Sequence, residues 1–128
     1  MSTCCRIARK NSSGSFDSIY CHWNGYPTYM LPMLRDNYGL DAKVAELIDY
    51  GYASSIGPRL MPTEDHSFDH PQPGVCVFYH RDRKEPWEDV APRLDDYKED
   101  IIRSSVDFVY VFEDGEWTCY SNGEEYIR

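Results

Sequence analysis

The sequence predicts a single α+β domain, built as an antiparallel sheet of about five strands with two or three short helices on one face. Three observations indicate this class. Strand-like apolar runs occupy both ends of the chain, segments with helical spacing lie between them, and 128 residues suffice for one core. The expected order is β-β-α-α-β-α-β-β, and residues 1–128 are expected to form one domain.

The first two strands are predicted to form a β-hairpin. Residues 3–10 and 16–23 carry alternating or β-branched apolar side chains, and the polar, glycine-containing stretch 11–15 connects them. The second strand is expected to end in a tight corner at residues 24–27, where Asn-Gly tolerates positive φ and proline removes a backbone donor.

Two short helices should follow the corner. Thr28 can cap a helix that runs to about Tyr38, and Asp41 can cap a second helix over residues 42–50. Gly51 supplies a stop for the second helix. The second helix carries an apolar stripe at helical spacing: Val44, Leu47 and Ile48.

The second half of the chain alternates irregular and regular segments. Residues 54–74 lose all periodicity and predict a long loop, which is either functional or mobile. The run 75–80 is apolar on both faces and predicts a central strand. An amphipathic helix is expected over residues 93–104, and a hairpin should join strands 106–112 and 117–120. The apolar stripe of that helix is Leu94, Tyr97 and Ile101.

The negative charge is concentrated in one half of the chain. Of a formal net charge of −9, residues 1–63 hold six bases and five acids, whereas residues 64–128 hold seven bases and 17 acids. This asymmetry argues against direct nucleic-acid binding by the second half and favours a protein partner with a basic surface. No apolar run is long enough to span a membrane, and the N-terminus lacks a signal-peptide hydrophobic region, so a cytoplasmic protein is expected.

The cysteines and histidines give no catalytic or metal-binding signature. The five cysteines form an odd set without a CxxC pair, so free thiols are expected. His66 and His70 have ligand spacing only on a helix, and Pro71 and the surrounding loop residues argue against one there. A cysteine with His22 or His80 lacks a third catalytic group at a recognisable spacing. The sequence therefore predicts a protein without cofactor or metal and without enzymatic activity.

Three groups of residues are candidate binding sites. The corner brings together aromatic side chains that could form a recognition patch, although Trp23 could instead pack in the core with Ile19. The corner residues are Tyr20, His22, Trp23 and Tyr26. A second group is an acidic surface, for which a solvated helix face is the plain alternative: Glu85, Glu88, Asp89, Asp95, Asp96, Glu99 and Asp100. The third group, His80, Arg81 and Arg83, could join the corner in a pocket for a nucleotide-like ligand.

Three segments together resemble a widespread family of small proteins of bacteriophages and prophages. They are SIYCHWNGYP at residues 18–27, GVCVFYHRDR at 74–83 and YVFEDGEW at 110–117. Members of that family tend to carry a YCHWDGYP motif, in which Asn24 here replaces the usual aspartate. The resemblance implies the cytosol of an infected or lysogenic bacterium, where small acidic proteins commonly inhibit host defence systems, including CRISPR effectors with basic nucleic-acid channels. The expected function is therefore binding and inhibition of such a host factor.

Overall fold

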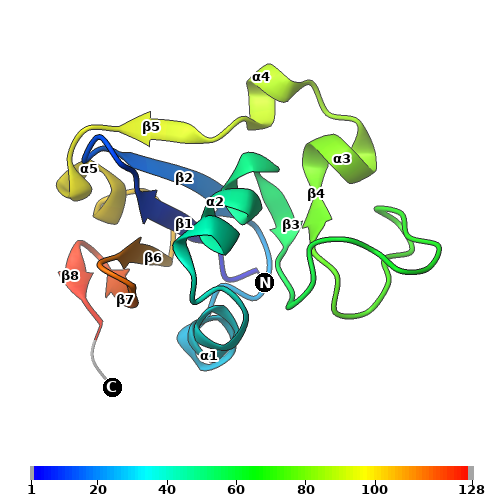
Figure 1. Ribbon diagram of the computed structural model, residues 1–128, viewed down its shortest axis with the longest axis horizontal. Helices are drawn as coiled ribbons and strands as arrows, with labels where there is room; N and C mark the ends of the chain where they lie inside the picture. The colour runs from blue at the N-terminus through cyan, green and yellow to red at the C-terminus, as the bar shows by residue number, and fades with distance from the viewer. Residues whose placement is uncertain (1, 127–128) are drawn as a thin grey trace.

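The computed structural model describes residues 2–126 as an α+β fold built on one mixed sheet (Figure 1). Within these residues the sheet has eight strands in the order β4-β3-β2-β1-β6-β7-β8, and β5 pairs with β2. The strands are β1 (Cys5–Lys10), β2 (Phe16–Cys21), β3 (Ala53–Ser55), β4 (Val77–Phe78), β5 (Arg93–Asp95), β6 (Phe108–Glu113), β7 (Glu116–Ser121) and β8 (Glu124–Glu125). The helices are α1 (Pro27–Asn37), α2 (Asp41–Asp49), α3 (Tyr79–Arg83), α4 (Trp87–Val90) and α5 (Lys98–Ile102).

The prediction of a purely antiparallel sheet is wrong. The two terminal hairpins, β1–β2 and β6–β7, are antiparallel as expected, but β1 joins β6 in a parallel pair, with Cys5 opposite Phe108. The β2–β3 pair is also parallel, because the chain returns from β2 to β3 through the α1 and α2 crossover. The short strands β3, β5 and β8 were not expected.

Helices pack on both faces of the sheet, not on one. Alternation along β1 sends Ile7 to the face covered by α1 and α2, and sends Ala8 to the opposite face. There Ala8 packs with Val109, Val111 and Ile101, the buried residue of α5. The sheet thus separates two apolar clusters.

The predicted positions of α1 and α2 are right to within a few residues, but their caps differ. Tyr26 is the N-cap of α1, and Pro27 is its first residue, where a missing N–H is harmless. Leu40 is the N-cap of α2, and Asp41 is the first helical residue. Gly51 follows α2 with φ of 85°, as its role as a stop requires.

The predicted helix over residues 93–104 is wrong. Residues 93–95 instead form β5, which pairs antiparallel with β2 by placing Arg93 opposite Ser18, and only Lys98–Ile102 is helical. Leu94 and Tyr97 are 62% and 68% exposed, so they form no buried stripe with Ile101. Pairing with the open edge of β2 has overridden the helical spacing.

The run 75–80 is not a central strand. Only Val77–Phe78 is a strand, it lies at the end of the sheet, and the chain continues directly into α3. Its apolar residues are buried because the irregular chain between β3 and β4 folds against them, with Ile56 and Leu60 in the core. Figure 1 shows this long loop extending beyond β3 and β4. Among residues 2–126, no helix has the length and apolarity needed to cross a membrane.

Candidate functional site

The aromatic corner is firmly anchored in the fold. Strand β2 ends at Cys21, and Asn24 takes φ of 60° in the turn. The backbone N–H of Gly25 donates to the carbonyl of Thr3 at 2.9 Å, and the hydroxyl of Tyr110 donates to the carbonyl of Gly25 at 2.7 Å. The corner is therefore a fixed junction between the start of the chain and β6.

The four predicted corner residues divide into two pairs. Trp23 and Tyr26 are 46% and 41% exposed, so the alternative that Trp23 packs in the core with Ile19 is wrong. Tyr20 and His22 are half-buried on the opposite side of β2 from Ile19, and the Tyr20 hydroxyl lies 2.8 Å from His22 Nδ1. The rings of His22 and Trp23 still touch edge to face, at 4.7 Å between centroids.

A polar cluster surrounds Tyr20 on this face. Arg6 is buried and donates to the hydroxyls of Ser18 and Tyr52, both at 2.8 Å, while its guanidinium covers the Tyr52 ring. Burial lowers the pKa of Arg6, although the bond to Tyr52 opposes this shift. Burial, together with a hydrogen bond to Cys4, raises the pKa of Tyr20 far above its ordinary value, so the phenol stays protonated.

The predicted acidic surface is an extended segment, which we call the acidic strap and define as residues 85–100. It runs through α4 and β5 to the start of α5 along one border of the molecule (Figure 1). Its exposed acids are Glu88, Asp89, Asp96, Glu99 and Asp100. Glu85 and Asp95 differ from these, because each accepts from a neighbouring arginine, Arg83 at 2.8 Å and Arg93 at 2.7 Å.

Large apolar side chains are interleaved with the acids of the strap. Trp87, Leu94 and Tyr97 are 40%, 62% and 68% exposed. Aromatic side chains with open faces are frequent anchors of protein interfaces. The strap therefore combines negative charge with apolar contact area.

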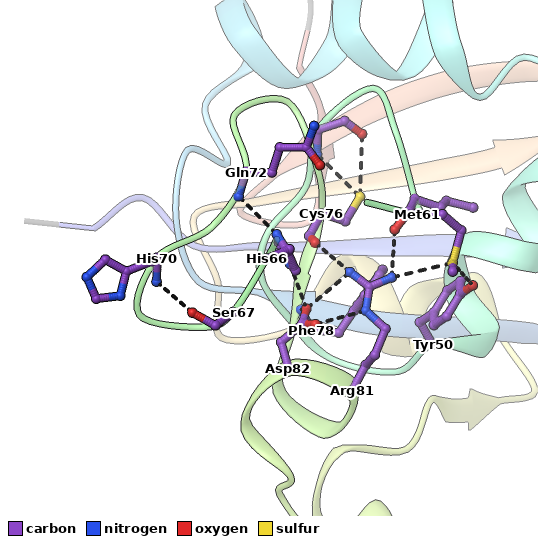
Figure 2. A network of polar contacts seen from close by, with 12 residues as sticks. Tyr50, Met61, His66, Ser67, His70, Gln72, Cys76, Phe78, Arg81 and Asp82 are labelled. Carbon is purple, nitrogen blue, oxygen red and sulfur yellow. Dashed lines mark hydrogen bonds and ion pairs between the residues drawn. The ribbon is translucent and has the colours of Figure 1, made fainter. Parts of the chain in front are cut away.

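Arg81, one of the three predicted ligand-pocket residues, is committed to internal contacts (Figure 2). Its guanidinium donates to the carbonyls of Leu60 at 2.6 Å and Cys76 at 2.9 Å, and it pairs with Asp82 at 3.0 Å. It also lies over the ring of Phe78, 4.9 Å from the centroid. Arg81 thus joins the long loop to α3.

Asp82 completes this network. Its side chain is 7% exposed and accepts from the backbone N–H of Phe78 at 2.8 Å, and it faces His66 Nε2 at 3.4 Å. His66 Nδ1 accepts from the backbone N–H of Gln72 at 3.0 Å, which leaves Nε2 as the protonated nitrogen facing the carboxylate. Within residues 2–126, His66 therefore packs against Asp82 without a hydrogen bond from Nε2, and the bonds of Arg81 are what join the loop to α3.

The other two pocket residues lie near aromatic rings. The Arg83 guanidinium lies 4.5 Å from the ring centroid of Phe68 and 4.8 Å from that of Tyr79. His80 is exposed, packs edge to face on Trp87, and has Nδ1 2.8 Å from the carbonyl of Glu85. Arg83 and His80 thus border the start of the strap.

The two loop histidines do not converge on a common point. Figure 2 shows His70 pointing away from His66. No group of three or more histidine, cysteine or acidic side chains within residues 2–126 is arranged to hold a metal ion.

Sequence reasoning singled out the acids of the strap, most of which are exposed, but it assigned Leu94 and Tyr97 to a buried helix stripe and did not single out Trp87. The position of Trp87, between Pro86 and the pair Glu88-Asp89, is the local signal for its exposure. Comparison with protein-family models, curated proteins and solved structures gives no match for this chain.

Proposed function

We propose that the protein is a non-enzymatic inhibitor that binds a bacterial antiviral defence component, such as a CRISPR effector, through the acidic strap. The observation that carries this proposal is the alternation of exposed acids with exposed apolar side chains along residues 85–100. The setting, a phage or prophage protein in the host cytosol, is supported by the resemblance of residues 18–27, 74–83 and 110–117.

The charges of the strap select a basic partner. Within residues 2–126, no cation lies within ion-pair distance of Glu88, Asp89, Glu99 or Asp100. A field of one sign on the surface attracts an oppositely charged protein and repels nucleic acid directly. Nucleic-acid channels of effectors carry the required positive charge.

The apolar side chains of the strap supply contact area that charge alone lacks. Trp87, Leu94 and Tyr97 keep 40% to 68% of their surface in water, which a bound partner would remove. Burial of each would contribute on the order of 1–2 kcal/mol to binding, a range typical of apolar side chains at interfaces. Electrostatic attraction would thus bring the partners together, and these residues would hold the complex.

The test compares variants in a bacterium that carries the defence system. Wild-type protein should restore phage plating and capture the effector. A variant in which Glu88, Asp89, Glu99 and Asp100 become amides should bind at least about tenfold more weakly at low salt, and the loss should shrink at high salt. The control changes two exposed acids of the first half, Asp36→Asn and Asp49→Asn, which is half the number of charges that the strap variant loses, and it should bind like wild type.

Two outcomes would contradict the proposal. The first is binding by the wild-type protein that does not change between low and high salt. The second is equal loss in the strap variant and in the Asp36, Asp49 control, since both lose surface charge but only one alters the strap.

A second candidate function is the binding of a small nucleotide-like ligand. It is favoured by the placement of Arg83 over Phe68 and Tyr79, because a cation beside aromatic faces suits a stacked, phosphorylated ligand. This function predicts that the purified protein carries an ultraviolet-absorbing small molecule that Arg83→Ala loses. A ligand-free preparation that captures a host polypeptide would decide for the first proposal.

A further inference from the structure

Cys4 differs from the other cysteines in its surroundings. All five are free thiols, and Cys5, Cys21, Cys76 and Cys119 are buried in the core. Cys4 is partly exposed just before β1. Its backbone N–H donates to the Asp107 carboxylate at 2.9 Å, and its carbonyl accepts from the Asp107 N–H at 3.1 Å, so the chain is fixed there.

The side chain of Cys4 belongs to a chain of hydrogen bonds. The Tyr20 hydroxyl donates to Cys4 Sγ at 3.0 Å and lies 2.8 Å from His22 Nδ1. Cys4 Sγ is itself 4.0 Å from His22 Nδ1. The β1–β2 register explains this convergence. Arg6 pairs with Tyr20, so Cys4 and His22 continue the same two strands, with side chains on the same face.

The chain of hydrogen bonds is satisfied by two arrangements of its protons. In one, the Cys4 thiol donates to the Tyr20 oxygen and the Tyr20 hydroxyl donates to His22 Nδ1. In the other, which alone has the Tyr20-to-Cys4 direction found in the structure, His22 Nδ1 donates to Tyr20, and Tyr20 donates to a Cys4 thiolate. Moving two protons converts the first into the second, so His22 can act as a base toward Cys4 through the tyrosine hydroxyl.

A surface pocket of about 470 Å³ has Cys4 among its lining residues. It is lined by Cys4, by residues 103–107 and by Asn122. The lining residues include Arg103, Ser104, Ser105 and Asp107, which are residue types that can hydrogen-bond a small polar molecule.

We propose that Cys4, Tyr20 and His22 form a nucleophilic site that reacts with small polar carbon electrophiles entering this pocket. With iodoacetamide as the electrophile, the Cys4 sulfur attacks the methylene carbon, a C–S bond forms, and the C–I bond breaks as iodide leaves with its electron pair. The thiol proton passes to Tyr20 while the Tyr20 proton passes to His22. Tyr20 and His22 position the thiol and transfer its proton, and the Cys4 sulfur is the nucleophile.

The test measures the rate at which iodoacetamide alkylates each cysteine of the native protein, by peptide mass spectrometry. At pH 7, Cys4 should react faster than N-acetylcysteine. Tyr20→Phe and His22→Asn should each slow Cys4 by about tenfold or more, because each interrupts the proton transfer. Tyr52→Phe is the control, since it removes a hydroxyl from the same face without removing a contact to Cys4.

The pH dependence separates base assistance from simple access. Above about pH 9.5 an ordinary thiol is already a thiolate, so the rates of wild type and both variants should converge. Melting curves of each variant establish that it is folded before its rate is compared. Three results would each overturn the proposal. They are equal Cys4 alkylation rates in wild type and both variants at pH 7, a wild-type Cys4 rate no higher than that of N-acetylcysteine, and a slower rate in the variants that persists at pH 9.5.

Discussion

Replacing Asp82 by alanine should destabilise the protein by about 3 kcal/mol, near the lower end of the range for breaking a buried charge pair. The carboxylate is 7% exposed, and its loss would leave the Arg81 guanidinium and the Phe78 N–H without this acceptor. The lower end applies because Arg81 is 20% exposed and keeps its bonds to two backbone carbonyls. For a domain of this size, the loss corresponds to a fall in Tm of roughly 12 °C.

Urea unfolding at pH 7, followed by tryptophan fluorescence, measures this difference directly. The urea concentration at the midpoint should fall, while the slope of the free energy of unfolding against urea concentration stays the same. The reason is that Asp82→Ala alters the stability and not the surface exposed on unfolding. Asp82→Asn is the companion variant, since it keeps an acceptor oxygen but loses the charge, and its loss should be smaller. A loss below about 1 kcal/mol for the alanine variant would refute the role of this network, since that is the range of exposed ion pairs.

The pH dependence of the same difference provides a second check. Burial alone would raise the pKa of Asp82, but bonds from Arg81 and the Phe78 N–H outweigh it and hold the pKa below its ordinary value. A carboxyl whose pKa is lower in the folded state stabilises fully above its unfolded pKa, about 3.9, and loses this stabilisation as pH falls through the folded pKa. The gap between wild type and Asp82→Ala should therefore be constant from pH 7 to 5 and shrink below about pH 4. A gap that shrinks already above pH 5 would contradict this reasoning.

Two further predictions test the corner and the strap. Gly25→Ala should lower the free energy of unfolding by about 2 kcal/mol, because the added Cβ would come within 2.8 Å of Cys5 Cβ. Gly14→Ala meets no atom within 4 Å and should lower it by only about 1 kcal/mol, because of its positive φ. Equal losses in urea unfolding would contradict the close contact at Gly25. Leu94→Ser should change the free energy of unfolding by less than about 0.5 kcal/mol, because Leu94 is exposed, whereas Ile101→Ala should lower it by about 3 kcal/mol. A large loss of stability for Leu94→Ser in thermal unfolding would instead support a buried helix over residues 93–104.

Local sequence signals predicted the elements that local chemistry determines. The terminal hairpins follow from alternating residues around glycine turns, and Gly51 marks the end of α2 with its positive φ. The parallel pairing of β1 with β6 was not predictable in this way, because residues about 100 positions apart leave no local pattern. Short strands such as β3 and β5 form because an edge of β2 is available, which is a tertiary cause.

The candidate site was predictable in its charge but not in its geometry. Counting acids identifies residues 85–100 from the sequence alone, because exposed charge needs no partner to be recognised. The exposure of Leu94 and Tyr97 depends on β5 forming, so helical spacing gave the opposite answer. The contact of Cys4 with Tyr20 and His22 depends on the register of the first hairpin, and sequence reasoning considered His22 with a cysteine but not which one.

Folding buries or pairs several cations of the chain but leaves the exposed acids of the strap without cation partners among the described residues. Arg6 and Arg81 direct their guanidinium donors into the protein, and Arg93 and Lys98 are paired with Asp95 and Glu113. The exposed acids of the strap have no such cation partner within the described residues, so their negative charge stays available to a partner. The salt dependence of binding is therefore the strongest test of the proposed interface. Attraction between the unpaired acids of the strap and a basic partner must weaken as the salt concentration rises. Cations that are already paired inside the fold contribute little to this change in affinity.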